Sequence, residues 1–212
     1  MAIYINSYLG SETRIFEALL KISGCDAGLS TTPDASEPVL VVQFRPKGPS
    51  SFSSGRLLEV VKSSKEVYIN GVDDSYPTVW GKPMSEYGGV TDVDITAATS
   101  ECNIWIDVTE ASGTGYRSLD SNGNFIYAPL AVILFHELAH VYHAMIAEDT
   151  PGEHTNDQLL AIADENQFRS QLGLPLRNPN VTIHDVTGPA TVAPTTLKGC
   201  NESGNPWAHV CE

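Results

Sequence analysis

The hydrophobic and polar positions in the first half of the chain follow two periods, one typical of strands and one typical of helices. Short apolar runs bounded by turn residues predict strands at residues 3–8, 39–44 and 66–70. Apolar residues recur every three or four positions over residues 11–23 and 55–64, which predicts two amphipathic helices. The first half of the chain is therefore predicted to alternate strands with helices.

The second half contains the most hydrophobic helix that the pattern predicts. Residues 71–102 carry Pro, Gly, Asp and Ser with little periodicity, so we expect a long surface excursion there. Alternation over residues 103–108 predicts a strand, and its polar members indicate an exposed edge of the sheet. The helix that begins at Pro129 is apolar on nearly every side, which predicts a central, buried position. A second helix is predicted over residues 156–172, ending at Gly173.

The composition is that of one globular domain with a tail. The chain has 212 residues, of which 42% are hydrophobic, enough to bury a core. We expect residues 1–178 to form the domain and residues 179–212 to form a C-terminal tail packed on it. The formal net charge of −14 argues against nucleic acid as the main partner. No apolar run reaches the roughly 18 residues of a membrane span, and the first residues lack the profile of a signal peptide.

The four cysteines predict disulfides rather than a metal site. None of them lies in the CxxC spacing of structural zinc sites. Their even number predicts two bridges, one joining Cys200 to Cys211 across the tail and one joining Cys25 to Cys102. The alternative is four buried thiols. Two Asn-X-Ser/Thr sequons also fit an exported protein.

The buried helix carries the sequence HELAH at residues 136–140. Positions i and i+4 share one face of a helix, so His136 and His140 can present ring nitrogens to a single metal ion. Glu137 lies near enough to take a proton from a water molecule without binding the metal itself. This pattern should arise by chance in roughly one chain in a hundred of this composition, and a buried helix would avoid such polar side chains unless a partner satisfied them. The predicted chemistry is zinc-dependent hydrolysis with Glu137 as the general base.

The third zinc ligand is expected to be a carboxylate. Sites of this type keep three protein ligands and one open position, and no histidine follows at the HExxHxxGxxH spacing. Asp157, in the first turn of the next helix, is preferred to Glu165, which Arg169 at i+4 could engage instead. His143, at i+3 from His140, is expected to support the site from outside or to lie on the surface. The other carboxylates within reach are Glu153 and Asp164.

Further residues are candidates for assisting catalysis. The strand at residues 103–108 could pair with an extended substrate, or it could be an ordinary structural strand. A side chain near the metal could donate to the tetrahedral oxyanion. Of the candidates, we expect Tyr142 to point away from the metal face and Arg169 to pair with a carboxylate. The oxyanion candidates are Tyr116, Tyr142, Arg169 and Arg177.

Three stretches of the chain together span about residues 50–178: SSGRLLEVVKSSKEVYI, the apolar run entering HELAH, and ENQFRSQLGLPLR at residues 165–177. They resemble the NleD-like zinc metalloprotease effectors, a family distantly similar to clostridial neurotoxin light chains. The resemblance implies an α+β, zincin-like single domain with a mixed sheet beside the buried HExxH helix. It also implies hydrolysis of peptide bonds.

This chain departs from the family at the third ligand. The family places a Glu-Glu-x-x-Thr-hydrophobic-Gly segment before ENxxR, and its first Glu binds the metal. Asp157 takes that place here, which agrees with the choice made from spacing, but Asp is one methylene shorter. Ala161 and Ala163 replace the Thr and the Gly.

The sequence therefore predicts a monomeric zinc endopeptidase that acts on a protein or peptide substrate. We expect it to be secreted, or delivered into a target cell as an effector or toxin. One alternative is a metallohydrolase acting on non-peptide bonds. The other is a non-catalytic interaction module that keeps a structural metal, against which the intact Glu137 argues.

Overall fold

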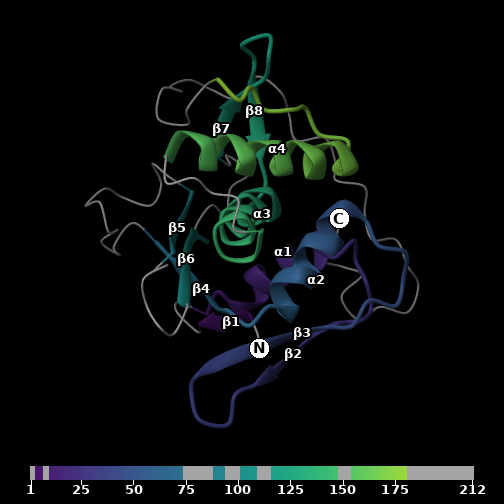
Figure 1. Ribbon diagram of the computed structural model, residues 1–212, viewed down its shortest axis with the longest axis vertical. Coiled ribbons are helices and arrows are strands. Elements are labelled where there is room, and N and C mark those ends of the chain that lie inside the picture. Colours follow the sequence, from purple (N-terminus) through teal and green to yellow (C-terminus); the bar gives the residue numbers. More distant parts are fainter. Residues whose placement is uncertain are drawn as a thin grey trace.

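The computed structural model describes residues 3–6, 10–73, 88–93, 101–108, 116–147 and 154–180. These residues form four α-helices, a six-stranded sheet and a separate β-hairpin (Figure 1). The predicted α+β class is confirmed, whereas the likeness to zincins stays a prediction. Within these ranges, no helix combines the length and apolar character that crossing a membrane requires.

The larger sheet is parallel at its centre and antiparallel at both edges. Its order is β2-β3-β1-β4-β6-β5, with β1, β4 and β6 parallel to one another and the other three strands antiparallel to their neighbours. The register aligns Ile5, Ile69 and Ile104 on the face that packs against the helices. The strands are β1 (Ile3–Asn6), β2 (Leu29–Pro33), β3 (Val39–Phe44), β4 (Glu66–Val72), β5 (Gly89–Val93) and β6 (Glu101–Asp107).

The helices form where the periodicity and the capping residues favour them. In α2, Ser51 and Ser54 exchange side-chain and backbone hydrogen bonds in a capping box, so the helix begins before the predicted Gly55. Gly173 ends α4 at φ 70°, and Leu174 N then donates to Arg169 O at 2.9 Å, as in a Schellman motif. The remaining elements are α1 (Glu12–Ile22), α2 (Phe52–Lys62), β7 (Tyr116–Leu119), β8 (Phe125–Ala128), α3 (Leu130–Val141), the π-helical η2 (Tyr142–Ala147) and α4 (His154–Leu172).

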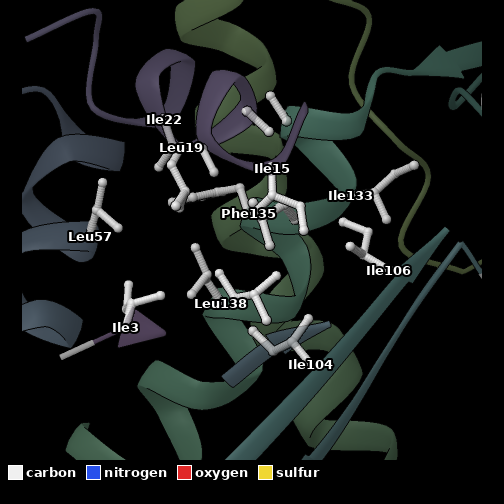
Figure 2. Packing of buried hydrophobic residues seen from close by; sticks show 14 of the residues in the cluster. Ile3, Ile15, Leu19, Ile22, Leu57, Ile104, Ile106, Ile133, Phe135 and Leu138 are labelled. Carbon is white, nitrogen blue, oxygen red and sulfur yellow. The ribbon is translucent and has the colours of Figure 1, made fainter. Parts of the chain in front are cut away.

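Helix α3 occupies the centre of the molecule, as its apolar sequence predicts. It packs against α1 on one side, α4 on another, and strands β5 and β6 of the sheet (Figure 1). Phe135 and Leu138 lie among Ile15 and Leu19 of α1 and Ile104 of β6 (Figure 2). Every residue from Ala131 to Val141 is buried, so the three polar residues of HELAH lie inside the protein.

The strand predictions from the sequence are wrong at β6, β5 and β2. Residues 103–108 were expected at an exposed edge, but β6 is an interior strand between β4 and β5. Its alternation arises because one face of the sheet packs on α3 while the other does not, and this does not distinguish an edge from an interior strand. The edge strand on this side of the sheet is β5, which lies in the expected surface excursion of residues 71–102. The sequence pattern also missed β2, in a polar stretch where only one residue is buried.

The cysteine pairing is also corrected. Cys102 is a free thiol buried in β6, and burial raises its pKa, so the predicted Cys25–Cys102 bridge is wrong. Cys25 is itself disulfide-bonded. The predicted Cys200–Cys211 bridge and the packing of the tail from residue 181 onward concern residues that the structure does not describe.

Candidate metal centre

The two histidines of HELAH face each other inside the protein. His136 and His140 are 6% and 8% exposed, and their rings are nearly perpendicular, at 82°. Their Nε2 atoms lie 3.2 Å apart. Two ring nitrogens bound to one tetrahedral zinc at the usual bond length would be about 3.3 Å apart. The pair therefore has the separation that a shared ion requires, and in the metal-free protein the same distance fits a hydrogen bond between the rings.

The other ring nitrogen of each histidine faces a carboxylate from α4. Nδ1 of His136 lies 3.0 Å from Glu165 Oε2, and Nδ1 of His140 lies 2.7 Å from Asp157 Oδ2. Neither contact is aligned as a linear hydrogen bond. A carboxylate at Nδ1 favours the tautomer with its proton there and its lone pair on Nε2, which is the form that binds metals. Burial lowers the pKa of His140, but Asp157 and the charge of Glu137 outweigh burial and raise it.

Two buried arginines hold Glu165 in its charged form. Arg169 Nε lies 2.6 Å from Oε1, and Arg177 Nη1 lies 2.9 Å from Oε2. Burial raises the pKa of Glu165, but the arginines and His136 more than reverse this and hold it well below its usual value. The predicted i+4 pairing of Arg169 with Glu165 is confirmed. Both arginines are engaged inside the protein, so neither contact supports their proposed role as oxyanion donors.

The residues of the ENQFR and GLPLR stretches are brought together around this carboxylate. Asn166 Nδ2 donates to the backbone oxygen of Arg177 at 2.9 Å, and the backbone nitrogen of Arg177 donates back to Asn166 Oδ1 at 2.7 Å. This pair of bonds fixes the segment after α4, and so places the Arg177 guanidinium on Glu165. The stretch at residues 165–177 thus builds the surroundings of His136.

Asp164 and His143 form a separate buried cluster. Asp164 Oδ2 lies 3.0 Å from Arg56 Nε and 3.2 Å from His143 Nε2, joining α2, η2 and α4. Of the two roles predicted for His143, the surface one is wrong, because its side chain is buried. The guanidinium of Arg56 also stacks over the ring of Tyr142, at 3.7 Å from the centroid. Tyr142 is therefore directed to α2, as expected of a side chain that points away from the metal face.

The predicted third ligand, Asp157, contacts a ring nitrogen of His140. Within the described residues, no three His, Cys, Asp or Glu side chains gather into a group that could hold a metal ion. A carboxylate at Nδ1 lies across the imidazole ring from an ion at Nε2, so ligation by Asp157 would require its carboxylate to leave His140 Nδ1. Asp157 therefore stays a prediction as a ligand. Glu153 and the side chain of Tyr116 lie outside the described residues.

Glu137 lies between α3 and the edge strand β5. Its side chain is 6% exposed, and Thr91 Oγ1 donates to its Oε2 at 2.6 Å. A Cβ atom placed on Gly89 would lie 2.8 Å from Oε1, which shows how closely the strand approaches the carboxylate. This contact was not predicted, because β5 lies in the stretch expected to be a surface excursion. The signal was present in GVTDV, since glycine within a β-branched run often marks a close backbone approach.

Comparison of the chain with known proteins and structures finds no match. The chain matches no family model, no curated protein and no solved structure. The resemblance to NleD-like metalloproteases therefore stays a prediction that depends on the three stretches of sequence.

Proposed function

We propose that the chain is a zinc-dependent endopeptidase in which His136 and His140 bind the metal and Glu137 is the general base. The observation that carries the proposal is the pair of opposed Nε2 atoms, 3.2 Å apart in a helix buried on every side. Burying two imidazoles and several carboxylates is costly, and a cation between the rings would offset part of that cost. The carboxylates of α4 support this role, because an anion at each Nδ1 favours the tautomer whose Nε2 lone pair can bind an ion between the rings.

The chain's own residues supply orientation and proton transfer. Zinc, when bound, lowers the pKa of a water molecule and polarises a carbonyl. Glu165 and Asp157 hold the imidazole rings, and the arginines keep Glu165 charged while they do so. Glu137 would accept a proton at its carboxylate and pass it to the leaving amine. Because Glu137 follows His136 directly in α3, we expect its carboxylate to reach a water molecule at the same centre.

Peptide substrates are favoured over other hydrolysable groups by the position of β5. This strand is the last of the sheet in the described residues, and it lies directly against the proposed base. An edge strand offers backbone donors and acceptors that can pair with an extended chain. We therefore propose that β5, rather than the strand at residues 103–108, pairs with an extended substrate. We also propose that the protein acts after secretion or delivery into a target cell, as the sequons and cysteines of the sequence indicate.

Metal content and cleavage together test the proposal. Purified wild-type protein and the Glu137→Gln variant should each bind about one zinc per chain, whereas His136→Ala and His140→Ala should not. New N-termini should form in a proteome treated with the wild type and be absent after treatment with Glu137→Gln. Zinc without cleavage would favour a structural metal site. Hydrolysis of small esters or amides alone, dependent on Glu137, would favour a metallohydrolase of another class.

A further inference from the structure

We propose that strand β5 positions the general base, with the Thr91 hydroxyl holding one oxygen of Glu137 and the missing side chain of Gly89 leaving room for the other. This inference rests on the proposed function, because it concerns the same carboxylate. Thr91 acts here as a positioning residue, through Glu137 rather than on a substrate.

The Thr91 contact is directed to the carboxylate. Its Oγ1 lies 2.6 Å from Glu137 Oε2 and 3.2 Å from the backbone oxygen of Glu137. A hydroxyl has one proton to donate, and the shorter contact to a carboxylate oxygen is the stronger of the two. One carboxylate oxygen of Glu137 therefore accepts the main hydrogen bond from Thr91 of β5. The contact with the backbone oxygen is the weaker one.

Gly89 provides the space that the carboxylate occupies. A Cβ atom there would lie 2.6 Å from Glu137 Cγ, 2.8 Å from Oε1 and 2.9 Å from Cδ, all closer than carbon atoms tolerate. The φ angle of Gly89 is not in the left-handed region, so space rather than backbone conformation accounts for the glycine. Any larger residue would displace the end of the Glu137 side chain.

The sheet register sets both residues against the same helix. Thr91 pairs with Ile104 and Gly89 with Ile106, two residues of β6 that are buried in the core with α3. Residues two apart in a strand point to the same face, so Thr91 and Gly89 both face α3. Holding Oε2 at Thr91 leaves Oε1, beside Gly89, as the oxygen that accepts the proton. A base fixed in one orientation avoids the loss of rate that follows from small displacements of reacting groups.

The contact can be tested in the metal-free protein without any substrate. Thr91→Val removes the hydroxyl and keeps the shape, Thr91→Ser keeps the hydroxyl, and Thr32→Val is a matched control on the exposed edge strand β2. In urea, Thr91→Val should lower the folding equilibrium constant about tenfold in the wild type and less than threefold in a Glu137→Ala background. Thr32→Val should be additive with Glu137→Ala. If Thr91→Val lowers the folding equilibrium constant equally in both backgrounds, the proposed interaction between Thr91 and Glu137 is wrong.

Measurements of kcat and KM then distinguish a positioning role of Thr91 and Gly89 from a purely structural one. With a substrate found by N-terminus mapping, Thr91→Val and Gly89→Ala should lower kcat about 10- to 100-fold, with KM within about twofold and zinc retained. Thr91→Ser should recover most of the loss, and Thr32→Val should behave as the wild type. A Thr91→Val enzyme with unchanged kcat, or a Thr91→Ser enzyme as slow as Thr91→Val, would overturn the inference.

The two proposals fail in different ways. If Glu137→Gln stays active, or if no zinc binds, the proposed function is wrong. The catalytic role of β5 is then wrong as well, even if the urea measurements show that Thr91 and Glu137 interact. If Glu137→Gln is inactive and Thr91→Val is not impaired, only the positioning role fails.

Discussion

Nδ1 of His136 lies 3.0 Å from Oε2 of Glu165, a carboxylate that is itself buried between two arginines. The contact links the proposed metal centre to a charged network on α4 and the segment after it. Because burying Arg169 and Arg177 requires a counter-charge, Glu165 has a role in stability as well as in orienting the imidazole. Changes at this carboxylate should therefore affect both properties.

Replacing Glu165 with Gln should weaken zinc binding about 10- to 100-fold, because His136 loses the anion that orients its ring. The same change should destabilise the protein by about 3 kcal/mol, since two buried guanidinium groups lose their counter-charge. A chelator competition assay and urea unfolding measure the two effects. Glu59→Gln, in a half-exposed pair with Arg56, is the matched control and should change neither. Full zinc affinity in Glu165→Gln would show that His136 does not depend on this contact.

The sequence predicts that Asp157 binds the metal, whereas its contact with Nδ1 of His140 predicts that it orients this ring instead. Asp157→Asn is then expected to keep about one zinc per chain and to weaken its binding about 10- to 100-fold. Metal analysis after dialysis, followed by competition with a chelator, distinguishes this from ligation. Complete loss of zinc in Asp157→Asn, comparable to that in His140→Ala, would instead support the ligand role predicted from the sequence.

The stability of the metal-free protein should fall in acid partly through Glu165. Its pKa is well below the ordinary value of 4.5 in the folded state, so the unfolded chain takes up a proton first as the pH falls. The contribution of Glu165 is complete above about pH 4.5 and is lost progressively below it. Urea midpoints measured between pH 7 and pH 3 should therefore decline more steeply for the wild type than for Glu165→Gln. Parallel curves would contradict the low pKa.

His143 should contribute to stability and not to metal binding. Its Nε2 contacts Asp164, whose carboxylate also pairs with Arg56, and this cluster joins three helical segments. His143→Ala should lower the free energy of unfolding by about 1–3 kcal/mol, because buried hydrogen-bonding groups lose a partner. Its zinc stoichiometry should equal that of the wild type. Loss of zinc from a folded His143→Ala protein would place this histidine at the metal after all.

Local relationships in this chain were predictable from sequence. The apolar run from Pro129 predicts a buried central helix, and the spacing of His136 and His140 predicts that both lie on one face of it. The i+4 pairing of Glu165 with Arg169 follows from the same helical geometry. In contrast, β2 and β5 were missed, since each is a short edge strand without a continuous apolar run, and the place of β6 inside the sheet depends on both its neighbours.

The candidate chemical groups could be identified from the sequence alone, because a helix sets the relation between residues one turn apart. Their surroundings depend on the folded structure: the carboxylates of α4 lie at Nδ1 of the histidines, and Thr91 and Gly89 of β5 lie against Glu137. These contacts join segments far apart in the chain. Their geometry depends on how helices and strands pack, and no local periodicity encodes that packing.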